Sequence, residues 1–323
     1  MPFIPPKRRR AGARTRIARI FAFGVVALVG GELIARFGLG LGDPPLFVTD
    51  SKIEYLNKPG TYHRFGHDIH INSWSMRAPE IAEHKPKSDE LRVLVIGDSV
   101  VFGGATLRDD EIATFELTRR LEQASGRKVL VANIAAGSWG PPNQLAYLER
   151  FGTFDADAMI VVWSSHDAWD VPTFAPLGVD NPTVSPGFAL GELWTRYIAP
   201  KVFPVASVPP AQTLAEADQS LRAARSILEL AIARKIPVAV VLHRTRSELG
   251  ASSVEGLELL GAVAKSEGVP VFETATVFSA PKADAQFRDD IHPTAGGQQL
   301  LADLYFKAVT SLLNAPPLTE PTP

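Results

Sequence analysis

Three residues near opposite ends of the domain have the types and spacing that nucleophilic catalysis requires. Ser99 follows Gly97-Asp98 directly, and Asp289 precedes His292 by three positions, a spacing that no other histidine of the chain has. A serine attacks a carbonyl group when a base removes its proton, and a carboxylate must orient that base and stabilise its cationic form. Ser99, His292 and Asp289 supply these roles if the fold joins the two stretches.

The residues around Ser99 predict where its side chain lies. Apart from one arginine, Leu91 to Ile96 is a run of Val, Leu and Ile, typical of a strand buried on both faces in a parallel sheet. Gly97 permits a sharp turn, so Ser99 follows the strand where open parallel sheets bind ligands. A short helix from Val100 would direct free N–H groups toward an anion at the Ser99 oxygen. Alternatively, Asp98 or Ser99 serves only as the N-cap of that helix.

Beyond Leu91 the sequence alternates between apolar runs of strand length and segments with helical periodicity. Strands are predicted at Leu91–Gly97, Lys128–Ile134, Ala158–Ser164, Pro237–His243 and Pro270–Glu273. Helices are predicted at Glu111–Ala124, Asn143–Phe151, Thr213–Lys235, Val254–Glu267 and Thr294–Leu313. This alternation implies a parallel sheet with helices on both faces, which is an α/β fold of three α/β/α layers.

Over roughly residues 91–313, about two thirds of the chain, the sequence resembles the SGNH (GDSL-type) esterase family. The first block of that family resembles Gly97-Asp98-Ser99, and its last resembles Asp289-x-x-His292 followed by Pro293. The resemblance implies a five-stranded parallel sheet with the flavodoxin-like strand order 2-1-3-4-5. It also implies that Ser99 attacks an ester carbonyl and lends its own N–H to the oxyanion hole, while His292 acts as base and then as acid. No cofactor and no metal are implied.

Two middle blocks of the family correspond less closely to this sequence. The second block supplies a backbone N–H to the oxyanion hole, and Gly137, Ser138 and Gly140 are the candidates for that donor. The third block is usually Gly-x-Asn-Asp, whose asparagine side chain is the other donor, but here it is Ser164-Ser-His-Asp167. Either His166 donates through its ring N–H in place of the amide, or it is a polar residue in a site that has changed its chemistry. We favour donation by His166, because the triad residues all remain.

The N-terminus carries seven positive charges in its first nineteen residues and leads directly into an apolar run. Residues 20–41 are interrupted only by Glu32 and Arg36, which can pair across one helical turn, and as a helix they span roughly 33 Å, about one hydrocarbon core. The positive-inside rule predicts a basic cytoplasmic segment (1–19), a transmembrane anchor (20–41) and an exported remainder. The alternatives are a cleaved signal peptide, although no A-x-A cleavage site follows the run, and an ordinary core helix.

The remainder of the chain has a globular and acidic composition. Hydrophobic residues make up 46% of the sequence and charged residues 21%, which excludes a disordered chain. Beyond Arg19, 26 basic residues against 35 acidic ones leave a net charge of −9, which argues against nucleic-acid binding. The absence of cysteine excludes disulfides and thiol chemistry. No feature predicts the oligomeric state.

Residues 42–90 are expected to form an irregular lead-in to the domain. Its histidines His63, His67 and His70 would share one face of a helix, which raises the alternative of a metal site. Gly66 and the neighbouring isoleucines favour extended structure instead, in which His70 points away from the other two.

Two further segments are distinguished by composition. Residues 167–210 are too long for an ordinary connection and are rich in Pro, Phe and Trp, so we expect an insertion that forms a substrate-facing flap. The tail 314–323 contains four prolines in its last nine residues, and we expect it to be disordered.

Together these features predict a serine esterase anchored in the bacterial inner membrane, with its catalytic domain in the periplasm or outside the cell. Its expected substrates carry ester-linked acyl groups, most simply O-acetyl groups, on an envelope or extracellular polysaccharide. The alternatives are an O-acyltransferase of exopolysaccharide, a lipid-directed acylhydrolase, a catalytically silent envelope scaffold and a metal hydrolase using the His63 cluster. The predicted partners are an ester-bearing carbohydrate or lipid and the membrane.

Overall fold

A five-stranded parallel sheet forms the centre of the α/β body in the computed structural model, which describes residues 10–85, 89–204 and 212–314. The strands are β5 (Leu91–Gly97), β6 (Val129–Ala135), β7 (Ala158–Ser164), β8 (Val238–His243) and β9 (Val271–Glu273). Their order across the sheet is β6-β5-β7-β8-β9, which confirms the predicted order 2-1-3-4-5. The chain order therefore reverses between β5 and β7, and the carboxyl ends of these strands border the crevice where such sheets bind ligands.

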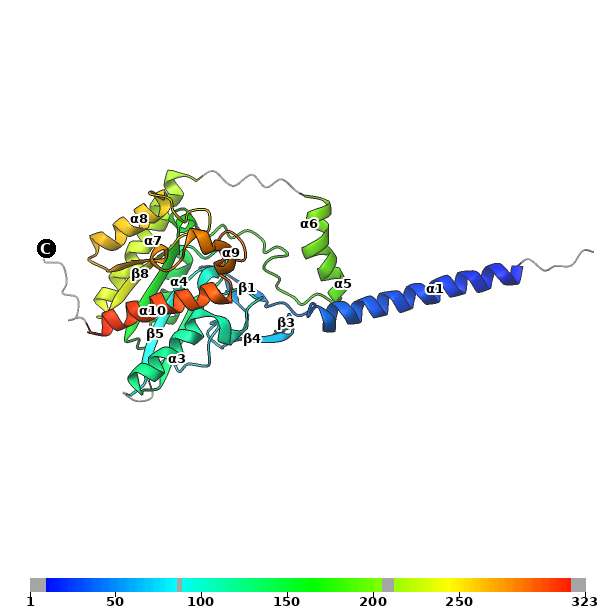
Figure 1. Ribbon diagram of the computed structural model, residues 1–323, viewed down its shortest axis with the longest axis horizontal. Coiled ribbons are helices and arrows are strands. Elements are labelled where there is room, and N and C mark those ends of the chain that lie inside the picture. The colour runs from blue at the N-terminus through cyan, green and yellow to red at the C-terminus, as the bar shows by residue number, and fades with distance from the viewer. Residues whose placement is uncertain (1–9, 86–88, 205–211, 315–323) are drawn as a thin grey trace, which may run out of the picture.

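Helices cover both faces of this sheet (Figure 1), which confirms the predicted three layers. One face carries α2 (Ser99–Phe102), α3 (Ala113–Ser125) and α10 (Ala295–Asn314). The other carries α4 (Pro141–Phe151), α7 (Leu214–Ala233) and α8 (Glu255–Ser266). Short helical turns complete the body: η2 (Asp109–Glu111), η3 (Ser165–Ala168), η5 (Thr274–Thr276), η6 (Ala280–Lys282) and α9 (Ala283–Gln286).

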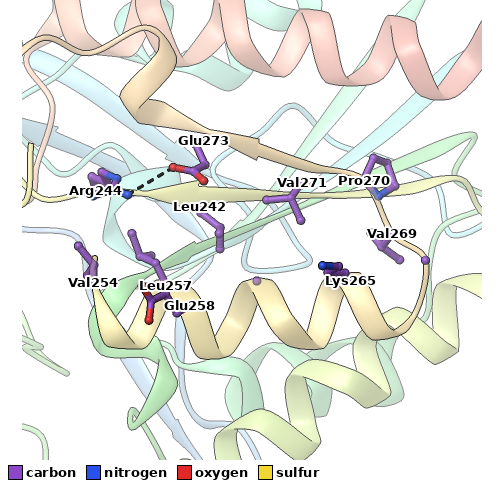
Figure 2. Close-up of a pocket in the computed structure, with 12 residues that line it drawn as sticks. Leu242, Arg244, Val254, Leu257, Glu258, Lys265, Val269, Pro270, Val271 and Glu273 are labelled. Carbon is purple, nitrogen blue, oxygen red and sulfur yellow. Dashed lines mark hydrogen bonds and ion pairs between the residues drawn. The ribbon is translucent and has the colours of Figure 1, made fainter. Parts of the chain in front are cut away.

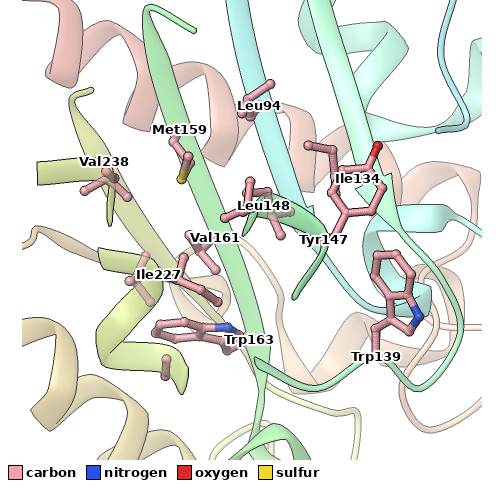
Figure 3. Packing of buried hydrophobic residues seen from close by; sticks show 14 of the residues in the cluster. Leu94, Ile134, Trp139, Tyr147, Leu148, Met159, Val161, Trp163, Ile227 and Val238 are labelled. Carbon is pink, nitrogen blue, oxygen red and sulfur yellow. The ribbon is translucent and has the colours of Figure 1, made fainter. Parts of the chain in front are cut away.

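Successive side chains of each strand fill two separate hydrophobic cores. In β5, Leu94 and Ile96 enter the core beneath α4, α7 and α8, whereas Val93 and Val95 enter the core beneath α3 and α10. Figure 3 shows the first of these cores, in which Trp163 and other large side chains pack between the sheet and the helices. Because both faces are covered, all seven residues of β5 are buried, and this explains why its sequence is apolar except for Arg92.

The lead-in is more regular than the sequence predicted. Its strands β1 (Phe47–Asp50) and β2 (Glu54–Asn57) form one antiparallel pair, and β3 (Gly60–Arg64) and β4 (His67–Ile71) form another. The extended structure expected around His63 and His70 is therefore confirmed. His63 Nδ1 lies 2.8 Å from an Asp68 oxygen and His70 Nδ1 lies 3.2 Å from Thr61 Oγ1. In the described part of the chain, the group that could hold a metal does not include these histidines.

An apolar helix projects from the body toward the N-terminus (Figure 1). It comprises α1 (Arg10–Leu33) and the π-helical η1 (Ile34–Gly38). The segment Arg14–Gly38 is 25 residues long and has a mean hydropathy of 2.0, and its most apolar stretch of 18 residues contains no buried residue. By length and composition it suits a membrane span or a signal sequence. The first nine residues of the predicted cytoplasmic segment, and the predicted tail from residue 315, lie outside the described residues.

The segment that follows β7 extends from the body to the C-terminal end of α1, which is the end next to the body (Figure 1). It contains α5 (Ala189–Glu192), η4 (Leu193–Ile198) and α6 (Ala199–Val202), which follow one another directly. Ala189 packs against Ala35, which lies in η1, and against Leu41, which follows it. The helical part of the predicted flap therefore lies beside the N-terminal helix.

Candidate active site

The structure brings Ser99, His292 and Asp289 together beyond the carboxyl end of β5. Ser99 Oγ lies 2.8 Å from His292 Nε2, and His292 Nδ1 lies 2.9 and 2.8 Å from the two carboxylate oxygens of Asp289. Asp289 can accept only if Nδ1 carries a proton, which in the neutral ring leaves Nε2 free to take the proton of Ser99. These three side chains can therefore act as nucleophile, base and orienting carboxylate.

The turn after β5 fixes the position of Ser99. A Cβ atom on Gly97 would lie 3.1 Å from the carbonyl oxygen of Val162 and even closer to a valine methyl group, so this position needs glycine. Asp98 is the N-cap of α2, because its Oδ1 accepts the N–H of Val100 at 2.8 Å. Since Asp98 performs the capping, the hydroxyl of Ser99 remains available to His292.

A buried arginine of the lead-in supports the far end of the same helix. The guanidinium of Arg77 donates to the carbonyl oxygens of Phe102, Gly104 and Leu107 at 3.1, 2.7 and 2.6 Å. Its Nε lies 2.7 Å from Asp109 Oδ1, which supplies a countercharge. The last carbonyls of a helix have no partner within it, so Arg77 completes α2 and the loop that follows. The lead-in thus helps to position the nucleophile, a role that the sequence did not suggest.

Two buried amides attach α2 to its neighbours. Asn133 of β6 donates to the carbonyl oxygen of Val101 at 2.7 Å, and Gln298 of α10 donates to that of Val100 at 3.2 Å. The Gln298 side chain also accepts the N–H of Ala113 at 2.9 Å. Because α10 begins just after His292, Gln298 links the nucleophile helix to the element that follows the base.

The base and its carboxylate lie in a tight loop before α10. Asp289 Oδ1 accepts the N–H groups of Ile291 and His292 at 3.0 and 2.7 Å. Partial burial opposes ionisation of Asp289, but its hydrogen bonds with His292 and Ile291 outweigh burial, so the pKa of Asp289 is lowered. Asp289 therefore remains ionised throughout the range in which a histidine base titrates.

A second histidine, buried at the end of β8, holds this loop from below. His243 Nε2 lies 2.9 Å from the carbonyl oxygen of Ile291, next to the base. Burial lowers the pKa of His243, so its ring is neutral and Nε2 carries the proton that the carbonyl accepts. Sequence reasoning missed this contact, although His243 ends a predicted strand at the edge where ligands bind.

His166 lies beside two buried carboxyl groups. Its Nε2 is 3.5 Å from Asp98 Oδ2 and 3.6 Å from Asp167 Oδ1, and that Asp167 oxygen has no hydrogen-bond partner. Burial, followed by the charges of Asp98 and Asp170, raises the pKa of Asp167 well above its usual value. Asp98, His166 and Asp167 place ligand atoms within 4.8 Å of one another, as a metal site requires. A metal would, however, have to displace the proton that this environment favours on Asp167.

The predicted oxyanion loop lies between β6 and α4. Ser138 has a left-handed backbone with φ of 55°, and a Cβ atom on Gly137 would meet open space. A Cβ atom on Gly140 would lie 2.1 Å from the carbonyl oxygen of Asp170, so close packing accounts for this glycine. The hydroxyl of Tyr55 donates to the carbonyl oxygen of Gly137, which ties the lead-in to the loop.

Two cavities near the carboxyl end of the sheet differ in their relation to these residues. One, of about 230 Å³, is lined by Ser138, by two residues of the lead-in and by residues of the insertion, namely Glu54, Tyr55, Asp170, Val171, Thr173, Ala175, Pro176, Leu177, Gly178 and Asn181. The other, of about 580 Å³, lies between β9 and α8 (Figure 2), and Ser99, His292 and Asp289 line neither cavity. The smaller cavity contains Ser138 of the predicted oxyanion loop and Asp170, which lies four residues beyond His166, so it is the better candidate for a substrate subsite.

Asp170 provides a test of the electrostatics around His166. Burial raises the pKa of Asp170 to about 6, partly offset by His166. A carboxyl group with a raised folded-state pKa contributes stability below its unfolded pKa, and this is lost as pH rises through about 4 to 6. Asp170→Asn should therefore raise the unfolding free energy of the full chain by about 1–3 kcal/mol at pH 8 and barely change it at pH 3.5.

Chemical denaturation of the full chain in detergent, at both pH values, measures this difference. Asp180→Asn is the matched control, because the Asp180 side chain is 87% exposed and should show no pH-dependent gain. An Asp170→Asn gain of equal size at both pH values would contradict the assignment of a raised pKa.

Comparisons with known proteins find similarity at low sequence identity to several solved structures. No family model and no curated protein matches the chain. An α/β-hydrolase enzyme from the metagenome of Lake Arreo, Spain, is 14% identical, with 70% of this chain and 97% of that chain covered at a TM-score of 0.43. A putative lipolytic protein of the G-D-S-L family from Desulfitobacterium hafniense DCB-2 is also 14% identical, with 67% and 98% covered and a TM-score of 0.40. An acetylxylan esterase from Geobacillus stearothermophilus is 12% identical, with 68% of this chain and 94% of that chain covered at a TM-score of 0.42.

Fold and site together define an α/β protein with a serine, a histidine and an aspartate at the carboxyl edge of a five-stranded parallel sheet. The strand order and the juxtaposition of these three residues are those that the resemblance to the SGNH (GDSL) type implies.

Proposed function

We propose that this protein is a serine esterase held at the outer face of a bacterial inner membrane. The observation that carries the proposal is the continuous series of contacts from Asp289 through His292 to Ser99 Oγ. Ser99 attacks the ester carbonyl carbon while His292 Nε2 takes the hydroxyl proton. His292 then gives this proton to the alcohol oxygen as the ester C–O bond breaks, which leaves an acyl group on Ser99. Water attacks the acyl group by the same route and restores the serine.

The negative charge that develops on the carbonyl oxygen requires hydrogen-bond donors. We assign this role to the backbone N–H of Ser99, to that of Gly137 or Ser138, and to the ring of His166. If Asp167 keeps its proton, its hydroxyl can donate to His166 Nε2 after a small approach from the present 3.6 Å. The ring proton would then reside on Nδ1, where it can serve as a neutral donor. This arrangement reproduces the amide donor of the family without a metal.

The substrate class follows from the size and polarity of the cavity beside Ser138. Its volume of about 230 Å³ suits a short acyl group better than a fatty chain, and its lining combines apolar residues such as Val171 and Leu177 with Glu54, Asp170 and Asn181, which can bind the hydroxyl groups of an alcohol. The acidic body argues mildly against anionic glycans. We therefore propose O-acetyl groups of an envelope or extracellular polysaccharide as the substrate.

The membrane location follows from the apolar helix and its flanking charges. The segment Arg14–Gly38 is long and apolar enough to cross a bilayer, and the basic residues cluster on its N-terminal side. The positive-inside rule then places this cluster in the cytoplasm and the α/β body outside.

A chain-length series distinguishes acetyl from lipid substrates. With aryl esters, kcat/KM for the acetyl ester should exceed that for the eight-carbon ester at least about tenfold, because the longer chain exceeds the polar cavity. Acetate release from an O-acetylated neutral polysaccharide should accompany this preference. Activity that rises beyond about eight carbons would favour a lipid ester instead. Acetyl transfer to an added saccharide, detected by mass spectrometry in place of acetate release, would identify a transferase.

A further inference from the structure

The helical part of the insertion exposes a row of large apolar side chains. Trp194, Ile198 and Val202 recur at intervals of four residues, and Phe188 and Phe203 stand at the two ends of the row. Their exposed fractions range from 36% to 72%. A row with this spacing lies on one side of a helix, so the segment 188–203 has an apolar face that the rest of the described chain leaves uncovered.

Hydrogen bonds attach the beginning of this segment to the apolar N-terminal helix. The Glu32 carboxylate accepts the N–H groups of Ala189 and Leu190 at 2.9 and 3.0 Å. The same carboxylate forms an ion pair with Arg36 at 2.9 Å, so the negative charge of Glu32 within the apolar helix is paired with a positive one. Glu32 therefore connects a predicted membrane span to the start of α5.

The position of Glu32 along α1 gives the depth of this contact. Glu32 lies thirteen residues beyond Arg19, the last residue of the basic cluster, which corresponds to roughly 20 Å along a helix. If Arg19 marks the inner boundary of a hydrocarbon core of about 30 Å, Glu32 lies inside that core, roughly 10 Å from its outer boundary. The N–H groups bound to Glu32 must lie at a similar depth.

The segment also has the direction of a surface helix. In Figure 1, α5 and α6 begin at the end of α1 next to the α/β body and run across the axis of α1. If α1 crosses a bilayer, this direction lies in the plane of the bilayer. Glu192 fixes this direction, since it forms a buried ion pair with Arg64 at 2.5 Å and accepts the N–H of Gly42 at 2.7 Å. Tyr197 accepts a further hydrogen bond from Arg64 at 2.8 Å.

A groove of about 410 Å³ separates α1 from the start of α5. It is lined by Leu28, Val29, Glu32, Leu33, Phe188 and Leu190. Leu28, Val29 and Leu33 of the apolar helix form one wall of the groove. If lipid surrounds this helix, lipid therefore also has access to the groove. Acyl chains meet this requirement, because they are apolar and flexible enough to fill an irregular gap.

We propose that residues 188–203 form an interfacial helix that lies in the outer leaflet, with phospholipid acyl chains filling the groove against α1. The apolar row faces lipid, and the Arg64–Glu192 pair holds the body at a fixed orientation to the membrane. This inference rests on the proposed membrane anchoring by α1 and is independent of the esterase chemistry.

Trp194 is a native probe for this contact. The full chain is reconstituted into phosphatidylcholine nanodiscs whose acyl chains carry bromine near the headgroup, and tryptophan fluorescence is compared with that in unbrominated discs. Trp194 is one of five tryptophans, so its quenching should remove up to about a fifth of the emission. This quenched component should be absent in Trp194→Phe. If bromolipid leaves the emission unchanged while aqueous iodide quenches Trp194, the segment does not lie in lipid and the inference is wrong.

Two variants separate this contact from general effects of an added charge. Ile198→Glu should lower the bromolipid quenching of Trp194 at least twofold, because it puts a carboxylate on the lipid-facing row. Leu214→Glu is the matched control on α7, where an apolar side chain is 90% exposed, and it should leave the quenching unchanged. If two copies of the chain can be chemically crosslinked, if this crosslinking is lost in Trp194→Phe, and if bromolipid does not quench the emission, the apolar face contacts a second copy. That result would overturn the lipid assignment.

Co-elution with the nanodiscs reports the anchoring separately. Protein that elutes with the discs but shows no bromolipid quenching would overturn the interfacial helix alone. Protein that fails to enter the discs would overturn the proposed anchoring by α1, and with it the interfacial helix, but not the esterase chemistry.

Discussion

Ser99→Ala should lower kcat for aryl acetate hydrolysis at least about a thousandfold, because no other group can form the acyl intermediate. His292→Ala should cause a loss of similar size, since Ser99 then lacks the base that lies 2.8 Å from its oxygen. The double variant should be hardly slower than either single variant, because a nucleophile and its base act as one unit. Steady-state kinetics on the four proteins measures this non-additivity.

Two controls make the kinetic result interpretable. Ser253→Ala removes a hydroxyl that bonds Glu258 on the exposed surface, and it should leave kcat unchanged. Far-UV circular dichroism should show that Ser99→Ala retains its fold, since Asp98 and not Ser99 caps α2. Losses that multiply in the double variant would show that Ser99 and His292 act independently, contrary to the proposed triad.

His166→Ala should lower kcat by about a hundred- to thousandfold while KM barely changes. Losing one donor to a developing oxyanion costs roughly 3–4 kcal/mol in the barrier, and the ground-state carbonyl depends little on that donor. His166→Asn should retain much of the activity, because an amide supplies an N–H at the same place in the third block. The difference between these two variants is the measurement that identifies the donor role.

The pH dependence provides a second readout of the same residue. The parent has an imidazole at position 166 that can gain a charge, whereas the amide of His166→Asn cannot, so the pH–rate profiles of the two proteins should differ if this side chain contacts the reacting oxygen. Asp289 does not account for such a difference, because its lowered pKa keeps it ionised in both proteins. If His166→Ala turns over as fast as the parent, His166 is not the donor and the third block has lost its family role in this chain.

The sheet and the triad were accessible from sequence for physical reasons. A strand buried on both faces is predominantly apolar, and β5 and β7 begin and end at the predicted residues. The triad was accessible because the base and its carboxylate lie in one short loop, where their spacing is visible. The predicted pairing of this loop with Ser99 depended on the family resemblance, since the two stretches are separated by most of the domain.

Other parts of the structure could not be predicted, because no local pattern in the sequence indicates them. The strands β1 to β4 have only four or five residues each, too few to establish an alternating pattern. Arg77 acts through carbonyl groups of a loop that starts 25 residues later, and no motif marks such a contact. The attachment of α5 to Glu32 spans 157 residues, so composition suggested a flap but could not indicate its position beside α1.

Covalent labelling with a serine-directed phosphonate tests the esterase proposal most directly. Phosphonylation requires a nucleophilic oxygen activated by a base, which an ordinary surface serine lacks. Intact-mass analysis of the full chain should show addition of one phosphonyl group, and peptide mapping should place it on Ser99. Ser99→Ala and His292→Ala should remain unlabelled under the same conditions. Labelling that persists in Ser99→Ala, or a parent protein that stays unmodified, would contradict the serine-esterase account.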